Sequence, residues 1–191
     1  MSSPEFGSRS FDVVVIGSAN LDLVATVEHL AAPGETVIAS GYAEHAGGKG
    51  LNQAVACSRS GARTAFIGCL GRDGAGDILR GVLADEGIRD FAVDTNVPTG
   101  RALISVDEQA ENSIVVVPGA NHHLGIGVVD DHRSILSDTA VVLAQLEIPL
   151  DSVEAAFAVA RLAGAITVLN PAPATELTPG LLALCDVIVP N

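Results

Sequence analysis

The 191-residue sequence has no tryptophan, one tyrosine and a single lysine, Lys49. Lysine and arginine together number 10 against 23 aspartates and glutamates, which leaves a net charge of −13. Because nucleic-acid binding relies on clustered lysine and arginine, this charge excludes a nucleic-acid-binding protein. The chain is still 48% hydrophobic and only 17% charged, so it can bury the core of one domain and differs from a disordered acidic segment.

Long apolar runs are also absent, since none approaches the ~18–20 residues of a membrane-spanning helix, and we expect no membrane association. Residues 1–10 lack the features of a signal peptide and resemble a vector-derived tail, which we set apart from the fold. Cys57, Cys69 and Cys185 are widely spaced and suit a reducing compartment rather than a disulfide framework or a zinc site. We therefore expect a cytoplasmic protein.

From residue 11 onward, short β-branched runs alternate with longer helical stretches. Strands are expected at residues 13–16, 64–69, 140–146, 165–169 and 186–189. Helices are expected at residues 49–60, 75–86, 151–163 and 177–184, and a glycine follows three of them, Gly61, Gly87 and Gly164. This alternation is typical of an α/β fold with a mainly parallel, doubly wound sheet.

Some segments depart from this alternation. A polar loop is expected at residues 17–22, and strands without intervening helices at 35–44 and 101–117, the second an antiparallel pair. We expect a small β-sheet lid, with strands within 35–46 and 98–118, on one edge of the domain that spans residues 11–191. The last apolar run resembles an interior strand, so we expect the domain to be truncated at its C-terminus.

The motif Gly47-Gly48-Lys49-Gly50-x-Asn52 opens the first expected helix. Glycines there let the backbone approach a ligand, and the free N–H groups of a helix start favour oxyanions or hydroxyl oxygens. It is not a Walker A loop, because Ala43 and Gly50 stand where that loop has glycine and serine or threonine. The alternative is a tight turn with a solvated lysine.

Polar side chains also follow two of the expected strands. Asn20 and Asp22 come after the first strand, where open α/β sheets bind ligands, and could hydrogen-bond adjacent hydroxyls of a polyol. An Asx-turn that satisfies its own backbone is the alternative for this pair. Glu147 follows another strand at the equivalent position, and alone it could equally be a solvated carboxylate. Convergence of these residues with the glycine-rich motif on one edge favours a ligand site.

Gly74-Ala75-Gly76-Asp77 has the shape of an anion-binding loop with an acidic residue. It stands directly before a regular amphipathic helix, and a carboxylate in the first turn complements the helix dipole. We therefore interpret Asp77 as structural. The five histidines show no metal-ligand spacing, and His122 and His123 are expected in an exposed loop, so no metal site is predicted within the chain.

Several motifs run along the chain between residues 12 and 191: Gly17-Ser-Ala-Asn20-Leu-Asp22, Pro33-Gly34-Glu35-Thr36, Gly47-Gly-Lys-Gly-Leu-Asn52-Gln-Ala, Thr99-Gly100-x-Ala102-Leu-Ile, Glu111-Asn112, Pro118-Gly119-Ala120-Asn121, Gln145-Leu-Glu147 and Leu169-Asn-Pro-Ala-Pro-Ala174. With them the chain resembles the N-terminal two-thirds of the ribokinases, in the PfkB carbohydrate-kinase superfamily. The Gly-Gly-Lys-Gly-x-Asn-Gln form and the Asn-x-Asp pair resemble ribokinase more than adenosine kinase or fructokinase.

The resemblance implies ATP-dependent phosphorylation of D-ribose at O5, giving ribose 5-phosphate. It implies that Asn20 and Asp22 hold sugar hydroxyls, that Glu147 makes a further sugar contact, and that the glycine-rich motif binds the opposite side through Gly48, Lys49, Gly50 and Asn52. It further implies that Asn191 lies near the nucleotide phosphates, that ATP, Mg²⁺ and K⁺ are cofactors, and that the lid forms a homodimer.

The family's catalytic base belongs to a second Gly-Ala-Gly-Asp segment, which would lie beyond Asn191 together with most of the ATP site. Asp77 occupies a different family position and inherits no catalytic role. Phosphoryl transfer depends on positioning and charge stabilisation, so this chain by itself is expected to be inactive. Two alternatives stay open: a kinase of another sugar or a nucleoside in the same superfamily, and a non-catalytic sugar-binding fragment.

Overall fold

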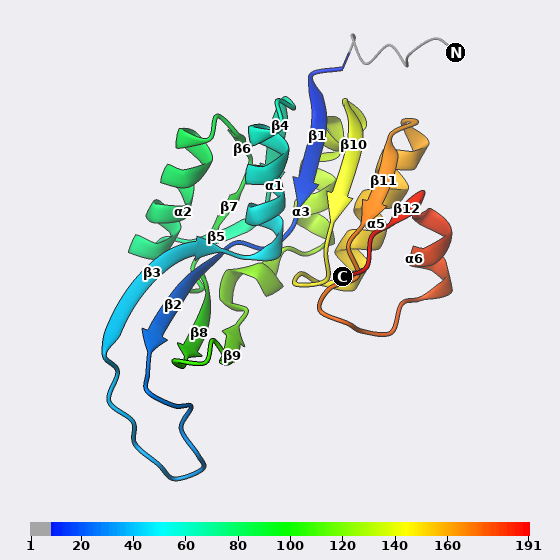
Figure 1. Ribbon diagram of the computed structural model, residues 1–191. Coiled ribbons are helices and arrows are strands. Elements are labelled where there is room, and N and C mark those ends of the chain that lie inside the picture. The colour runs from blue at the N-terminus through cyan, green and yellow to red at the C-terminus, as the bar shows by residue number, and fades with distance from the viewer. Residues whose placement is uncertain (1–8) are drawn as a thin grey trace.

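The computed structural model describes residues 9–191 (Figure 1). Its largest sheet consists of β1 (Phe11–Ile16), β4 (Thr64–Ile67), β6 (Arg89–Asp90), β10 (Thr139–Ala144), β11 (Ile166–Leu169) and β12 (Val187–Ile188). These strands lie in the order β12-β11-β10-β1-β4-β6, and every neighbouring pair is parallel. The α/β fold with a mainly parallel sheet, predicted from the alternation of strands and helices, is confirmed.

Helices cover both faces of this sheet. One face carries α1 (Lys49–Arg59) and α2 (Gly74–Asp85), and the other carries α3 (Ile126–Asp131), α4 (Arg133–Ser137), α5 (Leu150–Leu162) and α6 (Pro179–Leu184). Because successive side chains of a strand point to opposite faces, Val15 packs with the first helix pair while Val14 and Ile16 pack with the second group. No helix within residues 9–191 is long and apolar enough to cross a lipid bilayer.

Three glycines end helices as their positions in the sequence predict. Gly61, Gly87 and Gly164 follow α1, α2 and α5, and have φ values of +89°, +66° and +72°. A residue with a Cβ atom is strained at such angles, so glycine lets the chain leave the helix and turn into the next strand.

A second sheet of four strands, here called the lid sheet, projects from one end of the large sheet (Figure 1). It contains β2 (Asn20–Thr26), β3 (Gly41–Gly47), β8 (Gly100–Val106) and β9 (Asn112–Val117), in the order β3-β2-β8-β9. The antiparallel pair expected at 101–117 is present as β8 and β9. A parallel pair, β5 (Cys69–Gly71) and β7 (Val93–Thr95), lies beside the large sheet.

Two boundary predictions around the lid sheet are wrong. The expected polar loop at 17–22 ends at Ala19, because Asn20 already pairs with Gly47 and Gly100 as the first residue of β2. Pairing on both sides overrides the low strand propensity of asparagine and aspartate. The strand expected at 35–44 begins only at Gly41, because β2 ends at Thr26, the partner of Gly41, and leaves no strand for residues 35–40 to pair with.

The region between β9 and β10 is more helical than expected. A 3₁₀ helix, η1 (Gly119–His123), contains His122 and His123, which were predicted in a loop, although both are exposed as expected. At the other end of the chain, residues 1–8 of the predicted vector-derived tail lie outside the described residues. Arg9 donates to the carbonyl of Ala163 (2.9 Å) and the Ser10 N–H donates to Asp138 Oδ1 (3.2 Å), so these two residues contact the domain.

Asp73 joins α2 to the start of β8. It is the N-cap residue of α2: its Oδ1 accepts from the N–H of Gly76 (2.9 Å) and the hydroxyl of Thr99 (2.6 Å), and its Oδ2 accepts from the N–H of Thr99 (3.0 Å). Desolvation opposes ionisation here, but the hydrogen bonds from Thr99 and Gly76 outweigh it and hold the pKa of Asp73 below its usual value. Asp77, in contrast, is exposed in the first turn of the same helix.

We expect Asp73→Ala to lower the free energy of unfolding by about 1–2 kcal/mol at pH 7, the usual cost of an N-cap. The depressed pKa adds a pH dependence: the stabilisation is present above the unfolded value of about 3.9 and is lost as the pH falls through the folded one. Urea unfolding at pH 7 and below pH 4 measures both effects. Asp77→Ala is the control and should change stability by about 0.5 kcal/mol or less; equal losses in both variants would contradict the assignment.

Candidate functional site

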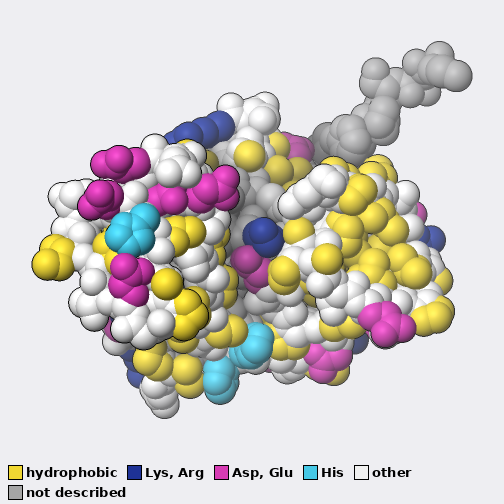
Figure 2. Space-filling model, turned by 60° about the horizontal axis from the view of Figure 1, so that its bottom comes forward, with side chains coloured by type: hydrophobic (Ala, Val, Ile, Leu, Met, Phe, Trp, Pro, Cys, Tyr) yellow, Lys and Arg dark blue, Asp and Glu magenta, His cyan; other side chains and the backbone are white. Residues whose placement is uncertain are grey.

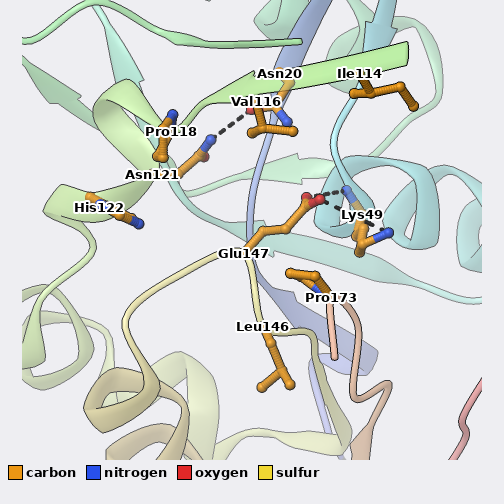
Figure 3. A pocket seen from close by; sticks show the side chains of 10 residues that line it. All are labelled: Asn20, Lys49, Ile114, Val116, Pro118, Asn121, His122, Leu146, Glu147 and Pro173. Atoms are coloured by element: carbon orange, nitrogen blue, oxygen red, sulfur yellow. Dashed lines mark hydrogen bonds and ion pairs between the residues drawn. The ribbon is translucent and has the colours of Figure 1, made fainter. Parts of the chain in front are cut away.

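A cavity of about 510 Å³ opens between the large sheet and the lid sheet, and its lining includes Asn20, Lys49 and Glu147 (Figure 3). Figure 2 shows a hollow between two parts of the molecule with basic and acidic side chains at its base. Asn20 follows β1 and Glu147 follows the neighbouring strand β10. From β1 the sheet continues to β4 on one side and from β10 to β11 on the other, so the cavity lies where the strand order reverses, a common ligand site in open α/β sheets.

Glu147 connects the segments around the cavity. Its Oε2 accepts hydrogen bonds from the hydroxyl of Ser18 (2.6 Å) and the N–H of Lys49 (3.0 Å). Its Oε1 lies 3.9 Å from Nζ of Lys49 (Figure 3). Since Lys49 is the first residue of α1, the carboxylate satisfies one of the free N–H groups of that helix while its second oxygen stays close to the cavity.

Two glycines let α1 approach the loop between β1 and β2. Gly48 has a φ of +88°, and a Cβ atom at this position would lie 2.8 Å from both Cα of Ala19 and N of Asn20. A Cβ atom at Gly50 would lie 2.6 Å from both N and O of Ser18. Because the colliding atoms belong to the backbone, only glycine permits this contact, which explains the glycine-rich motif physically.

The carboxylate of Asp22 lies over Gly47 on the neighbouring strand, where an added Cβ atom would be 2.2 Å from Oδ2. Burial raises the pKa of Asp22 above its usual value, the negative charge of Glu147 raises it further, and His45 opposes the shift. The structure therefore holds two carboxylates within electrostatic reach of each other, and ionisation of Asp22 has a cost in the folded state.

We expect Asp22→Asn to stabilise the protein at neutral pH. A raised folded pKa means that ionisation costs stability, and this cost grows as the pH rises from about 3.9, the unfolded value, through the folded pKa. The melting temperature of Asp22→Asn should therefore exceed that of the unmodified protein by more at pH 7 than at pH 4. A difference that is the same at both pH values would show that the carboxylate is not destabilised by its surroundings.

Five predicted site residues do not line the cavity directly: Asp22, Gly48, Gly50, Asn52 and Asn191. Asn52 is exposed on α1, and its backbone N–H donates to the carbonyl of Gly48 (3.0 Å). Asn191 is exposed near the end of β12, and its Oδ1 accepts from Nδ2 of Asn170 (3.2 Å). The roles predicted for these residues stay predictions.

Sequence reasoning assigned no role to other residues around the cavity. Ser18 is fully buried and donates to Glu147, and Asn121 is 1% exposed and contacts Asn20. Ile114 and Val116 of β9 form an apolar wall, together with Leu146 and Pro173. Ser18 and Asn121 belong to motifs that the sequence made visible, but only the three-dimensional contacts indicate what each side chain does.

Comparison with known proteins identifies the fold and the family. The family model "pfkB family carbohydrate kinase" matches residues 10–191. The chain is 44% identical over 181 residues to a ribokinase of Haemophilus influenzae. This alignment covers 94% of this chain and 59% of that protein. It is 47% identical over 182 residues to a bifunctional ribokinase/ribose-5-phosphate isomerase A of Fructilactobacillus sanfranciscensis, with 94% of this chain and 34% of that protein covered.

Solved structures of ribokinases have the same fold as this chain. A ribokinase from Thermotoga maritima superposes with a TM-score of 0.87 at 32% identity, over 94% of this chain and 59% of that one. A ribokinase from Arabidopsis thaliana, complexed with ribose and ATP, superposes with a TM-score of 0.84 at 32% identity, over 94% and 60%. The chain thus spans about three-fifths or less of the relatives named here. The family model matches almost the whole of this chain, residues 10–191, which shows that the chain belongs to the pfkB family of carbohydrate kinases.

Proposed function

We propose that the chain carries the sugar-binding part of an ATP-dependent kinase that phosphorylates D-ribose at O5. The observation that carries this proposal is the cavity, where Asn20, Lys49 and Glu147 converge from three separate segments at the carboxyl end of a parallel sheet. A ribokinase homologue of the same fold is complexed with ribose and ATP. A cavity of about 510 Å³ is large enough to enclose a pentose.

The residues around the cavity suit a polyol. Glu147 offers a carboxylate oxygen, Lys49 an ammonium group and Asn20 an amide, so a hydroxyl can both accept and donate at this site. We propose that Asp22 adds a second carboxylate, and that Gly48, Gly50 and Asn52 position the start of α1 against the sugar.

For the nucleotide, we propose that Asn191 lies near the phosphates and that the catalytic base and most of the ATP site come from protein beyond this residue. Within residues 9–191 there is no group of three or more histidine, cysteine, aspartate or glutamate side chains that could hold a metal ion. Mg²⁺ at a phosphoryl-transfer site is usually held by one or two carboxylates together with the nucleotide phosphates, so we propose that it belongs with the part of the ATP site beyond Asn191. The chemistry that we assign to the described residues is binding and orientation of the sugar.

Titration of the 191-residue chain with D-ribose in a calorimeter tests the proposal. We expect saturable binding at one site and no transfer of phosphate from ATP to ribose by this chain. Absence of binding, with the chain folded, would contradict the assignment of the cavity. The protein extended beyond Asn191 is expected to form ribose 5-phosphate from ribose and ATP.

A second acceptor, 2-deoxyribose, is favoured by one observation. The chain is 34% identical to a deoxyribokinase of Salmonella typhi and equally 34% identical to a ribokinase of Bacillus subtilis. Initial rates with ribose, 2-deoxyribose, fructose and adenosine, measured with the extended protein, separate the acceptors. A higher kcat/KM with any of the others would overturn the assignment to ribose.

We also propose that the lid sheet forms a homodimer. β9 is an edge strand of this sheet, and its residues Ile114, Val115, Val116 and Val117 are between 46% and 58% exposed. Ile114 and Val116 line the cavity, so Val115 and Val117 point to the other face and are free to meet a second copy. Sedimentation equilibrium should give twice the 19.4 kDa of one chain, and Val115→Lys should give the monomer.

A further inference from the structure

Asn121 lines the cavity beside Asn20 and is hydrogen-bonded to it. Its Oδ1 accepts from the N–H of Ala19 (3.0 Å), and its Nδ2 donates to the carbonyl of Ala19 (3.3 Å). Nδ2 also donates to Oδ1 of Asn20 (2.7 Å) (Figure 3). Only 1% of Asn121 is exposed, and these three hydrogen bonds use its oxygen and both of its N–H donors.

The direction of these hydrogen bonds is fixed by backbone groups. The N–H of Ala19 can only donate and its carbonyl can only accept, so the side-chain amide of Asn121 has a single orientation that satisfies both. In that orientation its nitrogen faces Asn20. Asn20 must therefore turn its oxygen toward Asn121, which leaves the nitrogen of Asn20 on the other side.

That nitrogen has no partner of its own. Asn20 is 3% exposed and lines the cavity, and within residues 9–191 its Nδ2 makes no hydrogen bond. The pair of amides is also held in place: a Cβ atom at Gly100, on β8, would lie 2.3 Å from both Nδ2 of Asn121 and Oδ1 of Asn20. Among the described residues, the only buried side-chain polar atom without a hydrogen-bond partner is Oε1 of Gln145, so Nδ2 of Asn20 is open to the cavity. A ligand oxygen at this point can accept from it in place of water.

We propose that Asn121 is a positioning residue that fixes the amide of Asn20 so that the cavity presents an N–H donor, and thereby selects a ligand with an acceptor oxygen at this point. A hydroxyl that accepts from Asn20 keeps its own proton, which it can donate to a carboxylate such as Glu147. The inference rests on the proposed sugar-binding function and adds which atom of Asn20 the sugar meets.

Asn121→Asp tests this orientation with almost no change in shape. At pH 7 one carboxylate oxygen still accepts from Ala19, but the other repels Oδ1 of Asn20, so Asn20 turns its nitrogen inward and its oxygen toward the cavity. We expect the Kd for D-ribose to rise about tenfold or more, the effect of replacing a hydrogen bond by two opposed acceptors. In an Asn20→Ala background the same Asn121→Asp change should have no further effect on the Kd.

The double-variant comparison separates positioning from a general structural role. If Asn121→Asp weakened ribose binding equally in both backgrounds, Asn121 would not act through Asn20 and the inference would be wrong. Should Asn121→Asp not fold, Asn121→Ala removes the donor without introducing a charge, and a loss of ribose affinity confined to the background that keeps Asn20 is expected.

A readout without ligand keeps the inference distinct from the proposed function. In the free chain, NMR should show slow exchange with water for the side-chain NH₂ of Asn121 and faster exchange for that of Asn20; the reverse order would overturn the inference. If the exchange rates agree and ribose does not bind to the unmodified chain, the proposed function fails while the orientation of Asn20 stands.

Discussion

Replacing Gly50 with alanine is expected to abolish measurable sugar binding and to lower the free energy of unfolding by about 3 kcal/mol. A Cβ atom at Gly50 would lie 2.6 Å from the backbone N and O of Ser18 and 2.7 Å from the carbonyl carbon of Gly17. These atoms continue directly from β1 in the centre of the sheet and cannot move without disturbing it. Instead α1 must move outward, which carries Lys49 away from Glu147 and breaks the hydrogen bond from the N–H of Leu51 to Ser18 (2.8 Å).

Gly81→Ala is the matched control for this variant. Gly81 lies within α2, and nothing is within 4 Å of a Cβ atom built there, so alanine should leave binding unchanged and stabilise the helix by up to about 1 kcal/mol. Calorimetric titration with ribose and urea unfolding of both variants give the comparison. Normal binding by Gly50→Ala would show that the contact between α1 and the loop after β1 is not needed for the site.

Glu147→Ala is expected to raise the Kd for ribose by about a hundredfold and to lower the free energy of unfolding by about 1–3 kcal/mol. Without the carboxylate, the fully buried hydroxyl of Ser18 and the N–H of Lys49 lose their acceptor, and Nζ of Lys49 loses its anionic neighbour. The loss of stability therefore comes from donors of the protein that are left without an acceptor. The loss of affinity comes from the missing sugar contact and from the greater mobility of Lys49.

Glu147→Gln divides the two effects. Its carbonyl oxygen can still accept from both Ser18 and Lys49, so stability should be close to that of the unmodified protein, while the charge beside the cavity is gone. If Glu147→Gln weakens ribose binding and leaves stability unchanged, the negative charge of Glu147 contributes to sugar binding and not to stability. Glu108→Ala, at an exposed turn residue, should change neither property. Glutamine and alanine variants of equal stability would contradict the hydrogen-bonding role of Glu147.

The parts of the fold that depend on local sequence could be predicted. The apolar run at Val13–Ile16 gives a buried central strand, and Gly61, Gly87 and Gly164 mark the ends of three helices because each needs a positive φ. β2 could not be found in this way, since Asn20 and Asp22 are poor strand formers and pair only because β3 and β8 flank them on both sides.

The candidate site, like the fold, could be predicted from the sequence only in part. The sequence could predict that Asn20, Lys49 and Glu147 lie close together, because the carboxyl ends of parallel strands share one edge of a sheet. The hydrogen bond by which Glu147 accepts from the start of α1 has no sequence signal, since it depends on a distance between segments about 100 residues apart. The same is true of Asn121, whose partners Ala19 and Asn20 are 102 and 101 positions away.

The division of the cavity between the two sheets has a mechanical consequence. Asn20 and Asp22 belong to the lid sheet, whereas Lys49 and Glu147 are attached to the large sheet. A sugar that contacts both groups adds a further link between two sheets that are already joined by short backbone connections such as residues 17–19 and by side-chain contacts such as that of Asp73 with Thr99. Sugar binding would then make the lid sheet more rigid. Amide hydrogens in β8 and β9 would exchange more slowly with ribose present, even at residues that do not contact the sugar.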